Sequence, residues 1–167
     1  MLAKKYWEHP KKVVWPAYIQ PKLDGHRCLA IVDANGKCEL WSRTRHRIVS
    51  VPHIVKAIED TGITDVTLDG ELYNHKYHDN FEVITHLANQ KTTPCPGGKT
   101  CRYAKETGET CPGYTAVQYH IYDQVLSMTF ATRSYLLSSW KDDNFAKASY
   151  SGPLVIVETL KVADVAD

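Results

Sequence analysis

The sequence has no long apolar run, no secretion signal and no even set of cysteines, and each lack removes a class of protein. The longest apolar stretches, such as Leu154–Val157, are far shorter than the roughly 18 residues of a membrane span, so we expect no membrane association. The first twelve residues, MLAKKYWEHPKK, contain no apolar signal core. Five cysteines without such a signal are typical of reduced thiols inside a cell. We therefore expect a cytoplasmic protein, in the host cytoplasm if it is viral.

The chain also lacks a strong excess of either charge. Twenty Lys+Arg against nineteen Asp+Glu give a formal net charge of +1, so any contact with nucleic acid must come from a local patch. No internal repeat or low-complexity tract is present. A length of 167 residues suits one domain and is short for two, and we expect a monomer.

Strand signals alternate with short helical signals along the chain. An Asn35-Gly36 turn between two strand-like runs predicts a hairpin over 27–43, because both residues tolerate the positive φ of tight turns. The helices expected from apolar periodicity are 51–61 (capped by Ser50), 80–89 and 134–141, and the further strands are 66–73, 117–125 and 154–160. Hairpin and alternation signals outnumber β-α-β signals. The predicted fold class is α+β, with an antiparallel-rich sheet flanked by helices.

Two of these predictions concern individual side chains. In the helix over 80–89 we expect Phe81 to be buried with the other apolar residues. In the strand over 117–125, simple alternation places Tyr122 and Gln124 on a polar face and Val125 on the apolar one. A tyrosine on such a face either contacts a ligand or packs in the core.

The segment 91–114 has no periodicity and is rich in glycine and proline, so we interpret it as an inserted loop. It contains Cys95, Cys101 and Cys111, with His86 and His120 at its flanks. Three thiols and an imidazole can form a tetrahedral zinc site. However, five residues separate Cys95 from Cys101 and nine separate Cys101 from Cys111, which is wider than the Cys-x-x-Cys spacing typical of zinc sites. Zinc, a disulfide and free reduced thiols remain alternatives.

The most informative stretch is Lys22-Leu23-Asp24-Gly25-His26-Arg27, which has the pattern Lys-x-Asp-Gly-x-Arg. Read alone, it is a strand ending in an Asp-Gly turn with two solvated basic residues. At average frequencies of about 5–7% per residue type, however, a chance match in a chain this short is on the order of one in several hundred.

Further motifs follow in order, and together they resemble the nucleotidyltransferase superfamily of ATP-dependent DNA ligases, RNA ligases and mRNA-capping guanylyltransferases. The segments that carry the resemblance are Lys22–Arg27 (nucleophile motif), Trp41–Thr44 (Ser-Arg motif), Asp69–Tyr73 (Asp-Gly-Glu motif) and Tyr119–Asp123 (aromatic-Asp motif). The likeness covers roughly 17–160, nearly the whole chain.

The resemblance implies a catalytic lysine, Lys22, that forms a covalent adduct with AMP. The implied nucleotide-binding residues are Gln20, Pro21, Leu23, Arg27, Arg43, Glu71 and Tyr122. ATP and Mg²⁺ are the implied cofactors, with Glu71 and Asp69 as candidate metal ligands. To attack near neutral pH, a lysine must lose its proton well below its ordinary pKa of about 10.4, which nearby cations or desolvation can bring about.

Three departures from the family pattern affect these expectations. Gln20 stands where DNA ligases commonly have Glu, which makes the choice of base less certain. A later Glu-Gly motif and a Lys-x-Lys motif are missing, and so is the C-terminal OB-fold. We expect residues 1–167 to be an adenylation domain truncated before its last motifs, weak or inactive in sealing.

Arg43, Arg45, His46 and Arg47 form a basic cluster after the first hairpin. Such a cluster is usually a solvated face, but next to ligase-like motifs we expect Arg45 and Arg47 to contact phosphates of nicked double-stranded DNA. The predicted function is an ATP-dependent DNA ligase of the compact phage type. The alternatives are an RNA ligase, a capping guanylyltransferase, or a non-catalytic remnant that binds nucleotide or nucleic acid.

Overall fold

The structure is a computed structural model, which describes residues 8, 10–92, 95, 100–143 and 152–163. Its strands are β1 (Ala17–Ile19), β2 (His26–Val32), β3 (Cys38–Ser42), β4 (Arg47–Ile48), β5 (Val66–Tyr73), β6 (Gln118–Gln124), β7 (Leu154–Ile156) and β8 (Leu160–Val162). Its α-helices are α1 (Pro52–Glu59), α2 (Phe81–Ala88), α3 (Arg102–Thr107) and α4 (Phe130–Asp143). Short 3-10 turns include η3 (His75–Tyr77) and η5 (Gly113–Ala116).

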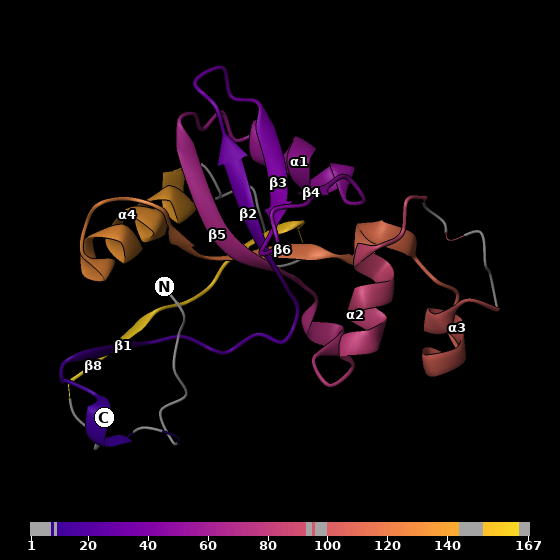
Figure 1. The fold of residues 1–167 in the computed structure, drawn as a ribbon, viewed down its shortest axis with the longest axis horizontal. Coiled ribbons are helices and arrows are strands. Elements are labelled where there is room, and N and C mark those ends of the chain that lie inside the picture. Colours follow the sequence, from indigo (N-terminus) through magenta and orange to yellow (C-terminus); the bar gives the residue numbers. More distant parts are fainter. Residues whose placement is uncertain (1–7, 9, 93–94, 96–99, 144–151, 164–167) are drawn as a thin grey trace.

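Six strands form one twisted sheet in the order β4-β3-β2-β5-β6-β7 (Figure 1). The predicted hairpin is confirmed: β2 pairs antiparallel with β3, and Gly36 in the connecting turn has φ +78°. Each further pair is antiparallel except β6 with β7, which is parallel. The α+β class with an antiparallel-rich sheet is therefore confirmed.

The final predicted strand, 154–160, is two strands in two different sheets. Residues 154–156 form β7 at the edge of the large sheet, whereas β8 pairs antiparallel with β1 in a separate two-stranded ribbon. Figure 1 shows this ribbon apart from the large sheet, with the segment between β1 and β2 crossing from one to the other. The prediction was wrong because a continuous β pattern does not reveal that its two halves have different partners.

The core lies between one face of the large sheet and the helices α1 and α2. Alternate β2 residues Cys28, Ala30 and Val32 are buried with helix residues such as Ile54 and Leu87. The side chains of β2 and β5 that alternate with these, including Arg27 and Glu71, project from the opposite face. The packing thus leaves one sheet face for polar chemistry.

Two predicted helix details differ from the structure. Phe81 is 40% exposed and packs against the ring of His26, with ring centroids 5.1 Å apart, instead of entering the core. Ser50 does not cap α1; its hydroxyl donates to the carbonyl of Ala88 and ties the start of α1 to the end of α2. The segment 91–114 is not a plain loop, because it contains α3 and the first half of η5.

A β-bulge in β6 changes which side chains face the core. Asp69 of β5 lies opposite Asp123, but Gly70 lies opposite Ile121, so Tyr122 is the extra residue. Beyond it the alternation is inverted: Gln124 is 2% exposed and Val125 is 59% exposed. Because of this inversion, the predictions that Gln124 lies on a polar face and Val125 on an apolar face are both wrong.

Within the described part of the chain, no helix combines the length and the apolar character needed to cross a membrane.

Candidate functional site

The segment that carries Lys22 runs directly over strand β5. The backbone N–H of Gly25 donates to Glu71 Oε1 at 3.3 Å. A Cβ atom on Gly25 would lie 2.4 Å from the carbonyl oxygen of Leu72, so only glycine permits this approach. The absence of a side chain at Gly25 thus lets the lysine segment lie close against strand β5.

Lys22 is exposed, but its positive charge influences Glu71 on strand β5. Burial raises the pKa of Glu71 to about 7, and the Gly25 N–H and the positive charges of Lys22 and Arg27 act against that rise. Leu23, the next residue, packs against the core and anchors the segment. The charge of Lys22 therefore acts on Glu71, although these two side chains, both within the described part of the chain, form no hydrogen bond or ion pair with each other.

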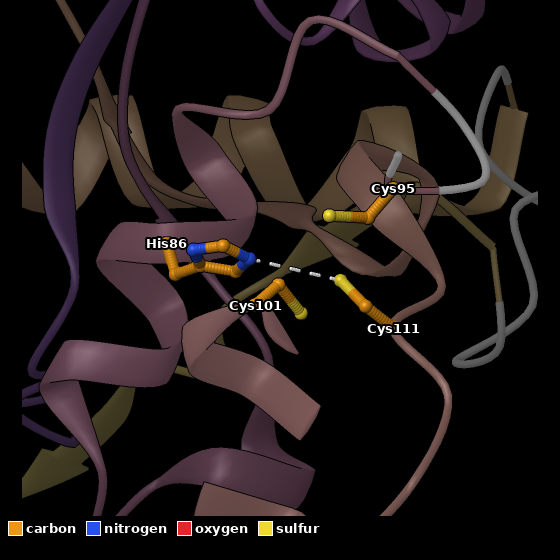
Figure 2. A group of neighbouring side chains, drawn as sticks. All are labelled: His86, Cys95, Cys101 and Cys111. Atoms are coloured by element: carbon orange, nitrogen blue, oxygen red, sulfur yellow. Dashed lines mark hydrogen bonds between the residues drawn. The ribbon is translucent and has the colours of Figure 1, made fainter. Parts of the chain in front are cut away.

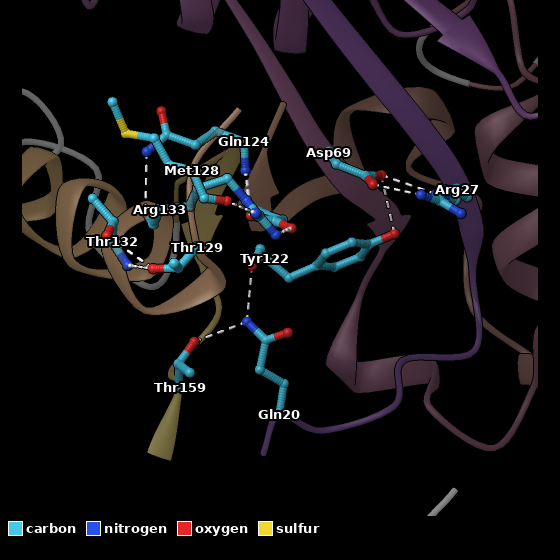
Figure 3. Close-up of polar contacts among 11 residues, drawn as sticks. Gln20, Arg27, Asp69, Tyr122, Gln124, Met128, Thr129, Thr132, Arg133 and Thr159 are labelled. Carbon is cyan, nitrogen blue, oxygen red and sulfur yellow. Dashed lines mark hydrogen bonds and ion pairs between the residues drawn. The ribbon is translucent and has the colours of Figure 1, made fainter. Parts of the chain in front are cut away.

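Arg27, Asp69 and Tyr122 form a chain of contacts across three neighbouring strands (Figure 3). Arg27 donates to both carboxylate oxygens of Asp69, at 3.0 Å from Nε and 2.5 Å from Nη2. The Tyr122 hydroxyl donates to Asp69 Oδ1 at 3.3 Å. The hydrogen bond to Asp69 raises the pKa of Arg27, and burial raises the pKa of Tyr122. Simple alternation places the Tyr122 ring on this face, and the bulge inverts the pattern only after it.

Gln20 lies on the other side of Tyr122 (Figure 3). Its Nε2 donates to the Tyr122 carbonyl and to Thr159 Oγ1, both at 2.8 Å. Because a backbone carbonyl only accepts hydrogen bonds, this contact fixes the orientation of the amide and leaves Oε1 as an acceptor. Sequence reasoning missed Thr159, since a partner 139 residues away gives no local signal.

A second anchor follows the bulge. Arg133 of α4 donates from Nε and Nη2 to the two oxygens of Asp123, both at 2.8 Å. Buried Gln124 donates from Nε2 to the Arg133 carbonyl at 3.0 Å. These contacts fix β6 to α4 immediately after Tyr122, and sequence reasoning did not predict the role of Arg133.

An open cleft of about 440 Å³ lies where β2 begins and β3 and β5 end. Arg27, Arg43 and Glu71 line it, together with Ser42 and Thr44 of the Ser-Arg segment. Gln20, Lys22 and Tyr122 do not line this cleft. The candidate residues therefore fall into a cationic cleft and an adjoining group around Tyr122, with Arg27 and Glu71 common to the two.

The basic cluster lies on the turn between β3 and β4. Arg45 is exposed and has φ +62°, in the left-handed region. Arg47, on β4, forms an ion pair with Glu39 of β3 at 2.9 Å. Arg45 consequently offers an exposed charge, whereas the charge of Arg47 is partly neutralised.

The three cysteines of the segment 91–114 come together with His86 and not with His120 (Figure 2). The imidazole of His120 instead contacts Gln118 Oε1 at 3.3 Å. Sequence reasoning therefore found the members of this cluster but could not choose between the two flanking histidines.

Comparison with known proteins identifies the family. The model of the ATP dependent DNA ligase domain matches residues 1–166. No curated protein matches this chain.

Solved structures show the same fold. Pmar-Lig_Pre is 22% identical with a TM-score of 0.67, and a Lig E DNA ligase, studied for DNA binding with a minimal scaffold, is 20% identical with a TM-score of 0.59. The match covers 99% of this chain in both cases, but 36% and 52% of those chains. The ATP-dependent DNA ligase of bacteriophage T7, in complex with ATP, is 13% identical with a TM-score of 0.58, over 89% of this chain and 50% of that one. This chain thus spans about a third to a half of these neighbours, and by the match over 1–166 it belongs to the ATP-dependent DNA ligase domain family.

Proposed function

We propose that this chain is the adenylation domain of an ATP-dependent DNA ligase and that Lys22 is its nucleophile. The unprotonated Nζ attacks the α-phosphorus of ATP, so that an N–P bond forms, the bond to the bridging oxygen breaks and pyrophosphate leaves. The AMP then passes to a 5′-phosphate at a nick, and a 3′-hydroxyl displaces it. The observation that supports this most is the Gly25–Glu71 contact, which holds the lysine segment against the acidic strand.

Glu71 and Tyr122 are proposed to hold the nucleoside. The half-buried aromatic ring of Tyr122 suits stacking on a base; Gln20 holds its backbone carbonyl, and the ion pair of Asp123 with Arg133 anchors the next residue. Glu71 presents a half-buried carboxylate suited to ribose hydroxyls. Pro21 restricts Gln20 to an extended backbone, and Leu23 anchors the following turn.

Gln20 supports ATP over GTP as the donor. Gln20 Nε2 donates hydrogen bonds to the Tyr122 carbonyl and to Thr159, so the group that Gln20 can offer to a base is the acceptor Oε1. The 6-amino group of adenine donates a hydrogen bond, whereas the corresponding O6 of guanine accepts one. A base read through Oε1 is therefore adenine, which argues against the capping alternative.

The two arginines have different proposed roles. Arg43 lines the cleft and is proposed to bind phosphate oxygens directly. Arg27 also lines the cleft, but both of its donor groups toward β5 are bound to Asp69. We assign Arg27 to phosphate binding through its remaining donor and to fixing Asp69 beneath Tyr122.

The residues present fit a magnesium ion at Glu71 better than at Asp69. Both oxygens of Asp69 accept bonds from Arg27, so a cation there would displace a guanidinium. Glu71 keeps one carboxylate oxygen for a hard cation. Bound there with the triphosphate, Mg²⁺ would neutralise charge on the departing pyrophosphate.

Incubation with α-labelled ATP and Mg²⁺ tests the proposal. We expect covalent label on the wild-type chain, none on Lys22→Ala, and wild-type labelling of the matched control Lys37→Ala, which removes an exposed lysine far from the site. Label from GTP would contradict the role of Gln20. Label on Lys22→Ala would identify a different nucleophile, and a folded wild-type chain without label would favour the non-catalytic alternative. Sealing of all-DNA nicks against nicks bridged by RNA then separates a DNA ligase from an RNA ligase.

A further inference from the structure

Four potential metal ligands converge beside α2, and none of them lines the cleft that contains Arg43 and Glu71. His86 lies in the last turn of α2, Cys95 follows that helix, Cys101 is the N-cap of α3, and Cys111 precedes η5. The imidazole nitrogen and the three sulfur atoms all lie within 4.8 Å of one another. Figure 2 shows the three sulfur atoms and the edge of the His86 ring directed into one small space.

The distances in this cluster are close to those of a tetrahedral zinc site. With Zn–S bonds of about 2.3 Å and a Zn–N bond of about 2.0 Å, neighbouring ligand atoms are separated by roughly 3.5–3.8 Å. Cys111 Sγ already lies 3.8 Å from His86 Nε2. No separation exceeds 4.8 Å, at most about 1 Å more than the tetrahedral value, which rotations of the side chains can close.

The surroundings of the cluster also suit a metal. Cys95 and Cys111 are 8% and 1% exposed, and none of the chain's five cysteines is in a disulfide. The backbone N–H of Ala104 donates to Cys101 Sγ at 3.4 Å, a contact that favours the thiolate form which binds metals. The amide nitrogen of Gln90 donates to the backbone carbonyl of His86 at 3.3 Å and lies 3.4 Å from Nδ1 and 3.2 Å from Nε2, so the amide packs against the imidazole.

A metal would also account for how the described part of this segment is held in place. Between α2 and β6 the described regular elements are the six-residue α3 and the short η5. The buried residue of α3 is Tyr103, whose hydroxyl forms hydrogen bonds with the Tyr77 hydroxyl and with Glu109. Short, weakly cored segments of this kind are commonly stabilised by structural zinc.

We propose that His86, Cys95, Cys101 and Cys111 bind one structural zinc ion that fixes the segment 91–114 against α2. Three thiolates and an imidazole select a soft or borderline cation over Mg²⁺ or Ca²⁺, so this site is distinct from the proposed magnesium position at Glu71. Four protein ligands fill a tetrahedral shell, which makes the role structural. The proposal does not depend on the adenylation chemistry.

Metal analysis of the full chain, purified under reducing conditions after growth with added zinc, tests this. We expect one zinc per chain for the wild type, for the control Cys38→Ala, which changes a cysteine outside the cluster, and for His86→Cys, which keeps four ligands. Cys111→Ser and His86→Ala should lose most of the zinc. Replacement by cobalt should give the intense visible absorption of a tetrahedral thiolate site.

A second measurement avoids the risk that a variant does not fold. Removal of zinc from the wild-type chain by a chelator should lower the melting temperature and open 91–114 to protease, and added zinc should restore both. A wild-type chain without zinc, or equal zinc in Cys111→Ser, would overturn the proposal. A mass lower by two hydrogens under non-reducing conditions, without zinc, would show a disulfide instead. Unchanged zinc affinity in His86→Ala would remove His86 from the ligand set.

Discussion

Replacing Glu71 with glutamine should stabilise the protein at alkaline pH and leave it almost unchanged at acidic pH. Burial raises the pKa of Glu71 from 4.5 to about 7. The folded state therefore holds this proton more tightly than the unfolded state does. The stability that the protonated carboxyl contributes is fully present below about pH 4 and is lost as the pH rises through about 7.

The size of the effect follows from the two pKa values. At about 1.4 kcal/mol per pKa unit, the rise from 4.5 to about 7 gives an upper bound of roughly 3 kcal/mol. Because Glu71 is only half-buried, solvent screening reduces the expected gain to about 1–2 kcal/mol. Glutamine is uncharged at both pH values and keeps an acceptor oxygen for the Gly25 N–H.

Urea unfolding, followed by circular dichroism at about pH 4 and pH 8.5, measures this difference. The control Glu106→Gln removes an exposed carboxylate of α3 and should show no pH-dependent gain. A difference between Glu71→Gln and wild type that stays constant with pH, or a variant less stable than wild type at pH 8.5, would refute the reasoning. Adenylation by the variant should fall, since it lacks the charge proposed to bind ribose and metal.

Two further changes test the sheet and the basic turn. Gly70→Ala would place a Cβ 2.5 Å from the His120 carbonyl oxygen and 2.6 Å from the Tyr119 ring. We therefore expect the free energy of unfolding to fall by about 3 kcal/mol. An unfolding midpoint equal to that of the wild type would contradict the close packing of β5 and β6 at the bulge. Arg45→Ala should weaken binding to nicked DNA and reduce the magnitude of the slope of log K against log salt by about 0.9. Arg102→Ala on α3 is the control. An unchanged slope in Arg45→Ala would exclude a phosphate contact at Arg45.

Local sequence patterns predicted the features that depend on neighbouring residues. The Asn35-Gly36 hairpin, the strand 66–73 and the helix starting after Asn80 all match, because turn chemistry, alternation and capping act over a few residues.

Features that depend on distant partners were not predictable in this way. The bulge at Tyr122 exists because β5 and β6 pair out of step, and no residue type near it marks the shift. The pairing of β1 with β8 and the contact of Gln20 with Thr159 join residues more than a hundred positions apart. The choice of His86 over His120 for the thiol cluster required the actual position of α2.

The contact between Gln20 and Thr159 has a consequence for the order of folding. The β2–β3 hairpin forms from residues adjacent in sequence and β5 pairs with β2 across fewer than fifty positions, but the amide beside the lysine segment is held only after the chain has reached β8. Closing so long a loop is slow compared with forming a hairpin. We expect a folding chain to have formed the pairing of β2, β3 and β5 before Gln20, the side chain proposed to read adenine, is in position, so that the proposed nucleotide binding is gained in the last stage of folding.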